Sequence, residues 1–200
     1  YGGSITNNTA AKGGGVCVVS GGTFNLYDGG TISGNTANST GGGVYVAGGT
    51  FTMSGGTISG NTTDSADGGV CVAGGQFTMS GGKITGNTAS SFSGGVGVHS
   101  SATFIMSGGT IGGTNASDAN NAKYGGGVNV SNYGKFTMSG GEITGNKATS
   151  NGGGVYVNGS DSVPNFGGKF TVSGKVTITG NKKGSADNNV YLVSANKPII

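Results

Sequence analysis

Hydrophobic residues along this chain alternate with small polar ones in three short motifs that return in a fixed order. The first motif reads GGxVxV, the second FxMSGG and the third I[S/T]GN. Alternation with a period of two is typical of β-strands that bury one face. The two valines of the first motif, the Phe and Met of the second and the Ile of the third are therefore predicted to face a common core. The residue between the two valines varies in type, so we expect it to point outward.

The isoleucine of the third motif recurs at steps of 27, 26, 26, 27, 32 and 35 residues. A repeat of this length is typical of a parallel β-solenoid. The sequence predicts an all-β fold, a right-handed single-stranded parallel β-helix of about seven coils of 26–35 residues, with three short strands in each coil. Residues 1–200 are expected to form one domain, with turn insertions near 117–124 and 159–168.

An asparagine closes the third motif in most coils. A side-chain amide both donates and accepts hydrogen bonds, so asparagines stacked at equivalent turns can bond to one another in a ladder. Thr114 is expected to stand in for the asparagine in the coil that contains Ile111. The predicted ladder residues are Asn8, Asn35, Asn61, Asn87, Asn146 and Asn181.

The amino-acid composition argues against nucleic-acid and membrane partners. Glycine accounts for 48 of the 200 residues, and charged residues make up only 8%. The net charge of +3 comes from lysines that are scattered along the chain, with no arginine and no basic run, so no nucleic-acid partner is expected. No apolar stretch approaches the roughly 18 residues of a membrane span, so no membrane insertion is expected either.

The residues that usually carry enzyme chemistry are sparse and dispersed. The seven acidic residues are spread over several coils and lie mostly in turns, so we predict no catalytic residues and no cofactor. Asp64 and Asp67 share a turn with no further acid nearby, which argues against a calcium site. His99 is the only histidine and is expected to be a solvated turn residue, so no metal ligands are predicted.

Three kinds of residue occupy outward positions. Cys17 and Cys71 fall in one outward column with Tyr45 between them, about twice the 4.8 Å strand spacing apart, so both are predicted to be free thiols. Tyr45, Tyr156 and Tyr191 share that column and are candidates for surface recognition of a sugar or a protein. Threonines are frequent beside the Phe and Ile positions. They resemble the flat threonine arrays of ice-binding solenoids, although lysine, glutamine and glutamate interrupt the rows.

The paired GG-[AG]-[IV] and [FI]-x-x-N motifs resemble those of the chlamydial polymorphic outer-membrane proteins and similar β-helix surface proteins. This resemblance covers the whole chain, although the repeats here carry Gly or Val where the family usually has Ala or Ile. It implies an extracellular or cell-surface location and adhesion to a host or cell-surface glycan or protein. Pectin-degrading enzymes share the fold, which makes a polysaccharide-active enzyme an alternative by analogy of fold alone.

The two ends of the sequence match in phase within the repeat. The chain opens with YGGSITNN and closes with NKPII, and neither segment is typical of a capping segment. We therefore expect either a module of a longer array or a subunit that associates end to end into a filament. The function expected from the sequence is that of a non-catalytic, structural or adhesive β-helix.

Overall fold

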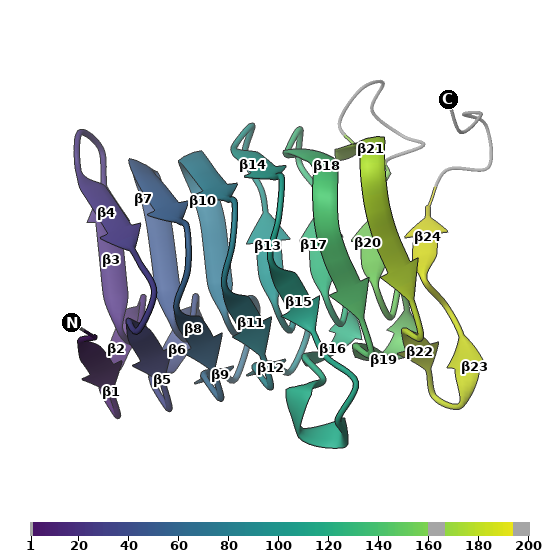
Figure 1. Cartoon of the computed structure of the whole chain (residues 1–200), viewed down its shortest axis with the longest axis horizontal. Helices are drawn as coiled ribbons and strands as arrows, with labels where there is room; N and C mark the ends of the chain where they lie inside the picture. Colours follow the sequence, from purple (N-terminus) through teal and green to yellow (C-terminus); the bar gives the residue numbers. More distant parts are fainter. Residues whose placement is uncertain (1, 160–166, 194–200) are drawn as a thin grey trace.

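The computed structural model describes residues 2–159 and 167–193, which form a parallel β-helix (Figure 1). Equivalent motifs of successive coils lie side by side and pair in parallel. The first motif forms β3 (Val16–Val19), β7 (Val44–Met53), β10 (Val70–Met79), β13 (Val96–Val98), β17 (Val128–Val130), β20 (Val155–Val157) and β24 (Val190–Leu192). The second motif forms β4 (Thr23–Leu26), the later parts of β7 and β10, then β14 (Thr103–Met106) and the starts of β18 (Lys135–Thr144) and β21 (Lys169–Thr179).

The third motif completes this large sheet. It forms β1 (Ser4–Thr6), β5 (Thr31–Ser33), β8 (Thr57–Ser59), β11 (Lys83–Thr85), β15 (Thr110–Gly112) and the ends of β18 and β21. The register places isoleucine opposite isoleucine in each pairing, from Ile5 to Ile178. The coil alignment predicted from the isoleucine steps is confirmed.

A second sheet of eight strands follows the ladder asparagines, in addition to the three strands expected in each coil. Its alternate positions bury small alanines such as Ala37, Ala89 and Ala148. A run of two to five residues with so small an inward side chain carries too little hydrophobic contrast to be recognised as a strand in the sequence. Its strands are β2 (Thr9–Lys12), β6 (Thr36–Thr40), β9 (Thr62–Thr63), β12 (Thr88–Ala89), β16 (Asn121–Tyr124), β19 (Lys147–Asn151), β22 (Lys182–Lys183) and β23 (Ala186–Asp187).

The core is a set of columns of like residues, as the alternation predicted. The rings of Phe51, Phe77, Phe104 and Phe136 are almost fully buried and stack with centroids 4.6–4.7 Å apart. Valine, methionine and isoleucine columns fill the remaining space. Since burying such a side chain contributes roughly 1.5–3 kcal/mol, the columns offset the entropic cost of ordering a glycine-rich backbone.

The asparagine ladder is present, but Thr114 is not part of it. Asn120 is buried in that coil, accepts hydrogen bonds from Asn87 and donates to Asn146. Every rung has the same chemistry, in which the backbone and side-chain nitrogens of one asparagine donate to the Oδ1 of the next, as from Asn35 to Asn61. The expectation for Thr114 was wrong because the extra residues of this coil precede the ladder position and move it along the chain.

Those extra residues lie between β15 and Asn120 and contain the 3₁₀ helix η1 (Ala116–Asp118), while much of 117–124 belongs to strand β16. The other predicted insertion, 159–168, falls mostly on residues 160–166, which lie outside the described residues, as does the closing NKPII segment.

The second sheet ends differently from the rest of the coils. Its last described strand, β23, pairs antiparallel with β22. Asn189 there accepts both ladder hydrogen bonds of Asn181, so the chain itself supplies the partner of this rung.

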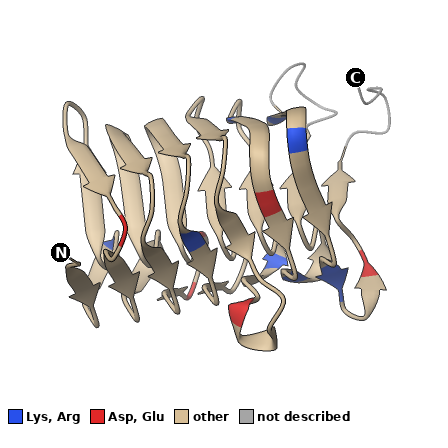
Figure 2. Ribbon diagram, in the orientation of Figure 1, with Lys and Arg blue, Asp and Glu red and all other residues tan. Residues whose placement is uncertain are grey.

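Charged side chains are few and dispersed over the described residues (Figure 2). Lys182 and Asp187 form an ion pair across the β22–β23 turn, and both are exposed. In the described part of the chain, no helix has the length and apolar character needed to cross a membrane.

Candidate functional site

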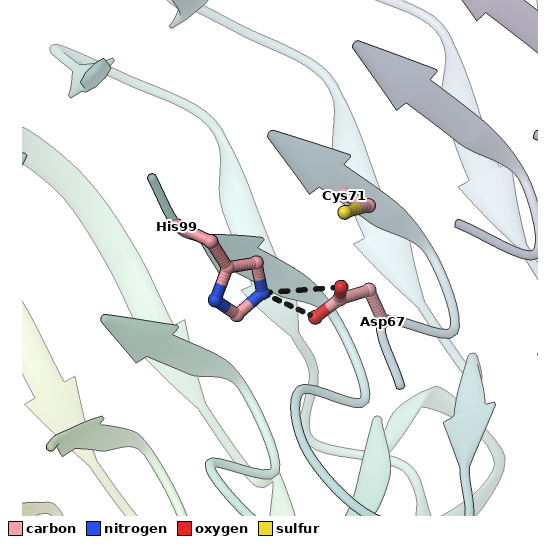
Figure 3. Close-up of side chains that lie close together, drawn as sticks. All are labelled: Asp67, Cys71 and His99. Carbon is pink, nitrogen blue, oxygen red and sulfur yellow. Dashed lines mark hydrogen bonds and ion pairs between the residues drawn. The ribbon is translucent and has the colours of Figure 1, made fainter. Parts of the chain in front are cut away.

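Three residues with reactive or metal-binding side chains lie together on the face of the large sheet that points away from the hydrophobic core: Asp67, Cys71 and His99 (Figure 3). Asp67 precedes β10, Cys71 lies near the start of β10, and His99 follows β13 in the next coil. The carboxylate oxygen, the thiol sulfur and the imidazole nitrogen lie within 4.8 Å of one another. We call these residues the Asp67–Cys71–His99 cluster.

The backbone at Asp67 has a conformation that most other coils give to glycine, and the next coil to Ser93. The first residue of the GGxVxV segment has a positive φ, for instance 68° at Gly41 and 66° at Gly125, and Asp67 adopts 66°. Only glycine reaches this region without steric cost, although aspartate tolerates it better than most residues. Asp67 therefore carries a side chain at a position that favours glycine. The carboxylate of this side chain is buried.

Asp67 and His99 form an ion pair. His99 Nε2 lies 3.1 Å from both carboxylate oxygens, and its Nδ1 lies 2.7 Å from the hydroxyl of Ser131. Thr40 donates a hydrogen bond of 2.8 Å to Oδ2 of Asp67. Only 18% of the His99 side chain and 2% of the Asp67 side chain are exposed. The expectation of a solvated turn histidine was therefore wrong, because stacking of the coils brings a buried acid from the preceding coil against the ring.

The position of Gly97 makes room for this ion pair. Gly97 lies between Cys71 and Asn129 in the outward column. A Cβ added at Gly97 would lie 1.8 Å from Oδ1 of Asp67 and 2.6 Å from Nε2 of His99. Any other residue at this position would collide with both partners, so the glycine is part of the cluster.

The electrostatics of the cluster favour a salt bridge and a neutral thiol. Burial alone would lower the pKa of His99, but the charge of Asp67 and the hydrogen bond to it raise that pKa above its usual value. Burial would raise the pKa of Asp67, but the charge of His99 and the hydrogen bonds it receives lower it. Burial, reinforced by the nearby carboxylate, raises the pKa of the Cys71 thiol well above its usual range.

This arrangement differs from that of a catalytic cysteine. An activated cysteine needs an imidazole that takes the thiol proton and a positive neighbour that stabilises the thiolate. Here both nitrogens of His99 face other partners, and the charged neighbour of the thiol is a carboxylate. The cluster therefore holds Cys71 as a protonated thiol.

Sequence reasoning missed this cluster, although the repeat carried a signal for it. Within a repeat, most residues are fixed by the fold, and departures from the repeat mark positions with another role. Asp67 replaces a glycine, Gly97 replaces a bulkier outward residue, and His99 is unique in the chain. All three departures meet at one place.

Both cysteines are free, as predicted, and they differ in exposure. Cys17 is exposed, whereas Cys71 is 2% exposed. Tyr45 lies between them in the register of β3, β7 and β10.

The three tyrosines proposed for recognition share one column of the register, as predicted, but they are not contiguous in it. Cys71, Gly97 and Asn129 separate Tyr45 from the other two. The Lys12 ammonium lies 5.3 Å from the ring centroid of Tyr45. Tyr156 stacks on Tyr191 at 5.8 Å and also contacts Tyr124 at 5.1 Å. Phe92 continues this group by stacking on Tyr124 at 5.2 Å. The result is an aromatic ridge, Phe92–Tyr124–Tyr156–Tyr191, beside the cluster.

The threonine rows are interrupted in the structure as they are in the sequence. Thr50 pairs in register with Gln76, and Thr57 pairs with Lys83. The threonine columns that resemble an ice-binding face are therefore discontinuous in the register.

No protein-family model, curated protein or solved structure matches the chain.

Proposed function

We propose that this chain is a rigid, non-catalytic module of an extracellular surface protein, whose coils set a fixed length and whose outer faces and loops carry recognition. The observation that supports this function is the unbroken stacking of like residues through the coils. Phenylalanine lies on phenylalanine and asparagine on asparagine from one end of the described core to the other. Such columns resist bending and extension because each coil is tied to both neighbours.

The surface location rests on the resemblance of the repeat motifs to those of the chlamydial polymorphic outer-membrane proteins. Antibodies against this chain should label intact cells of the organism that makes it, or its culture medium. Labelling that requires permeabilised cells would contradict the proposal. Incubation with a panel of polysaccharides should release no reducing sugar, and release that increases with protein concentration would favour the polysaccharide-active alternative.

The aromatic ridge is the surface we propose for recognition of a protein partner. Because its rings stack on one another, neighbouring rings cover part of each ring face, and this suits a protein surface better than a sugar ring. Tyr191→Ala should weaken adhesion to target cells at least fivefold. Tyr27→Ala is the matched control, because Tyr27 is more exposed, at 63% against 37%, and lies on a different coil.

A second candidate is end-to-end assembly into a filament. Apolar side chains of the last described coils are exposed, including Val172, Val190 and Leu192. Stacking of another copy would bury them through a head-to-tail interface. Sedimentation velocity should then show species that grow with concentration, and a monomer at every concentration would contradict the filament.

A further inference from the structure

We propose that Asp67, Cys71 and His99 bind a single divalent transition-metal ion of the zinc type, a role that is independent of the structural function proposed above. The three side chains offer an oxygen, a sulfur and a nitrogen donor from two adjacent coils. This mixed set suits zinc, whose sites combine cysteine, histidine and carboxylate ligands.

The spacing of the donors is close to that of a tetrahedral site. With metal–ligand bonds of about 2.0–2.3 Å, the ligand atoms of a tetrahedral ion lie roughly 3.3–3.6 Å apart. His99 Nε2 and the Asp67 oxygens are 3.1 Å apart, and all three donor atoms lie within 4.8 Å of one another. Small side-chain rotations would therefore bring the donors around one ion.

Neighbouring side chains already hold two of the ligands in the orientation that a metal requires. A metal-binding histidine usually donates its second ring N–H to a polar partner, and a ligating carboxylate is usually hydrogen-bonded. Ser131 lies 2.7 Å from Nδ1 of His99, which leaves Nε2 for the ion. Thr40 donates to Oδ2 of Asp67 and leaves Oδ1 for the ion.

Asn129 provides an independent observation that points to a ligand here. Its side chain is 1% exposed, and its Oδ1 accepts no hydrogen bond within the described part of the chain. Asn129 pairs in register with Gly97, over which the Asp67–His99 pair lies. Asn129, His99 and Ser131 line one pocket of about 190 Å³, which borders the Asp67–Cys71–His99 cluster through His99. A buried acceptor of this kind needs a donor, and a water bound to an ion at His99 would supply one.

The charges of the donors suit a divalent ion. A histidine nitrogen binds a metal without its proton and a cysteine binds it as the thiolate. The carboxylate of Asp67 and the thiolate of Cys71 would then balance the two positive charges of the ion, so no net charge would be buried.

The test uses Co²⁺ as a spectroscopic probe and Zn²⁺ as a competitor, added to the full chain after treatment with a chelator. Wild-type protein should bind about one Co²⁺ per chain, with a thiolate-to-cobalt charge-transfer band that Zn²⁺ removes. Cys71→Ser should abolish the band, and His99→Gln should reduce Co²⁺ affinity at least tenfold. Ser131→Ala should reduce it by roughly 10–100-fold, as for other hydrogen-bond partners of metal ligands.

Cys17→Ser is the matched control, since Cys17 occupies the same outward column but is exposed and lies outside the cluster. This variant should keep the band and the stoichiometry. Circular dichroism of each variant establishes that it is folded. The proposal is overturned if wild-type protein gives no thiolate band, or if the band survives Cys71→Ser.

Discussion

The carboxylate of Asp67 and the imidazole of His99 meet directly above Gly97, in the space that a Cβ at that position would occupy. Their 32-residue separation in sequence becomes a contact of 3.1 Å because one coil stacks on the next. The glycine between them is thus a requirement of the ion pair and not of the turn, since Gly97 lies within strand β13.

Gly97→Ala should separate the ion pair. The added methyl would overlap Oδ1 of Asp67 and Nε2 of His99, and overpacking of this kind typically costs about 1–3 kcal/mol. Urea unfolding followed by circular dichroism measures the change in the free energy of unfolding. Gly3→Ala is the control, because a Cβ there meets nothing within 4 Å and should change stability by less than about 0.5 kcal/mol. Equal stability of the two variants would contradict the geometry described for Gly97.

The Asp67–His99 pair should make stability depend on pH. The pKa of His99 is raised in the folded state, so its contribution is complete below the usual value of 6.5 and is lost as pH rises through the folded-state pKa. The pKa of Asp67 is lowered, so its contribution is present above the usual value of 3.8 and is lost as pH falls through the folded-state pKa. The pair therefore stabilises the fold most between these two usual values.

The measurement is urea unfolding from pH 4 to pH 8 in the presence of a chelator. Wild-type protein should lose stability as pH rises from 6 to 8, and His99→Asn should show a flatter profile over the same range. Cys71, which faces the pair, keeps its proton throughout this range because burial raises its pKa. An unchanged slope in His99→Asn would mean that another group governs the dependence.

Substitution of a ladder asparagine should lower the free energy of unfolding most at the centre of the ladder. Asn87→Ala would leave the backbone and side-chain nitrogens of Asn61 without their acceptor in a fully buried position. Each buried group left unpaired costs about 1–3 kcal/mol, so with two such nitrogens the variant should lose about 2–6 kcal/mol of unfolding free energy. Asn8→Ala, at an exposed rung, should lose less than about 1 kcal/mol.

The same measurement tests the assignment of Asn120. Asn120→Ala should behave like Asn87→Ala, because Asn120 is buried and bonds to a ladder asparagine on each side. Thr114→Ala should be nearly neutral. The reverse order of stabilities would restore the ladder position first expected from the sequence.

The two thiols should react at very different rates. A thiol reagent should modify Cys17 of native protein readily, whereas Cys71 is buried and its thiol is held in the protonated form. Mass spectrometry should find one modified cysteine per native chain and two after unfolding in denaturant. Rapid labelling of Cys71 in native protein would show that the cluster opens to solvent.

The columns of the core could be predicted from the sequence because the same positions of the repeat are buried in every coil. Val44, Phe51 and Ile58 each recur at a constant spacing and with the same inward orientation. The ladder was predicted for the same reason, except at Asn120, where a fixed distance from Ile111 selected Thr114 although the inserted residues had shifted the rung.

The Asp67–Cys71–His99 cluster could not be predicted in this way. His99 is the only histidine of the chain, the three residues come from two adjacent coils, and the contact of Asp67 with His99 depends on how far the two side chains reach across Gly97. The second sheet was missed for a different reason, since alanines such as Ala37 and Ala148 bury too little surface to mark a strand.

The constant register of the coils also bears on how such a chain can change. Asn35, Asn61 and Asn87 are separated by 26 residues, and each makes the same bonds to the next. Duplication or loss of one whole period would join equivalent positions and leave every remaining contact in its place. The length of the β-helix is therefore the property that can change most freely in evolution, in steps of one coil. The coils that carry Asp67 and His99 must stay adjacent, however, because a coil inserted between them would separate the two side chains.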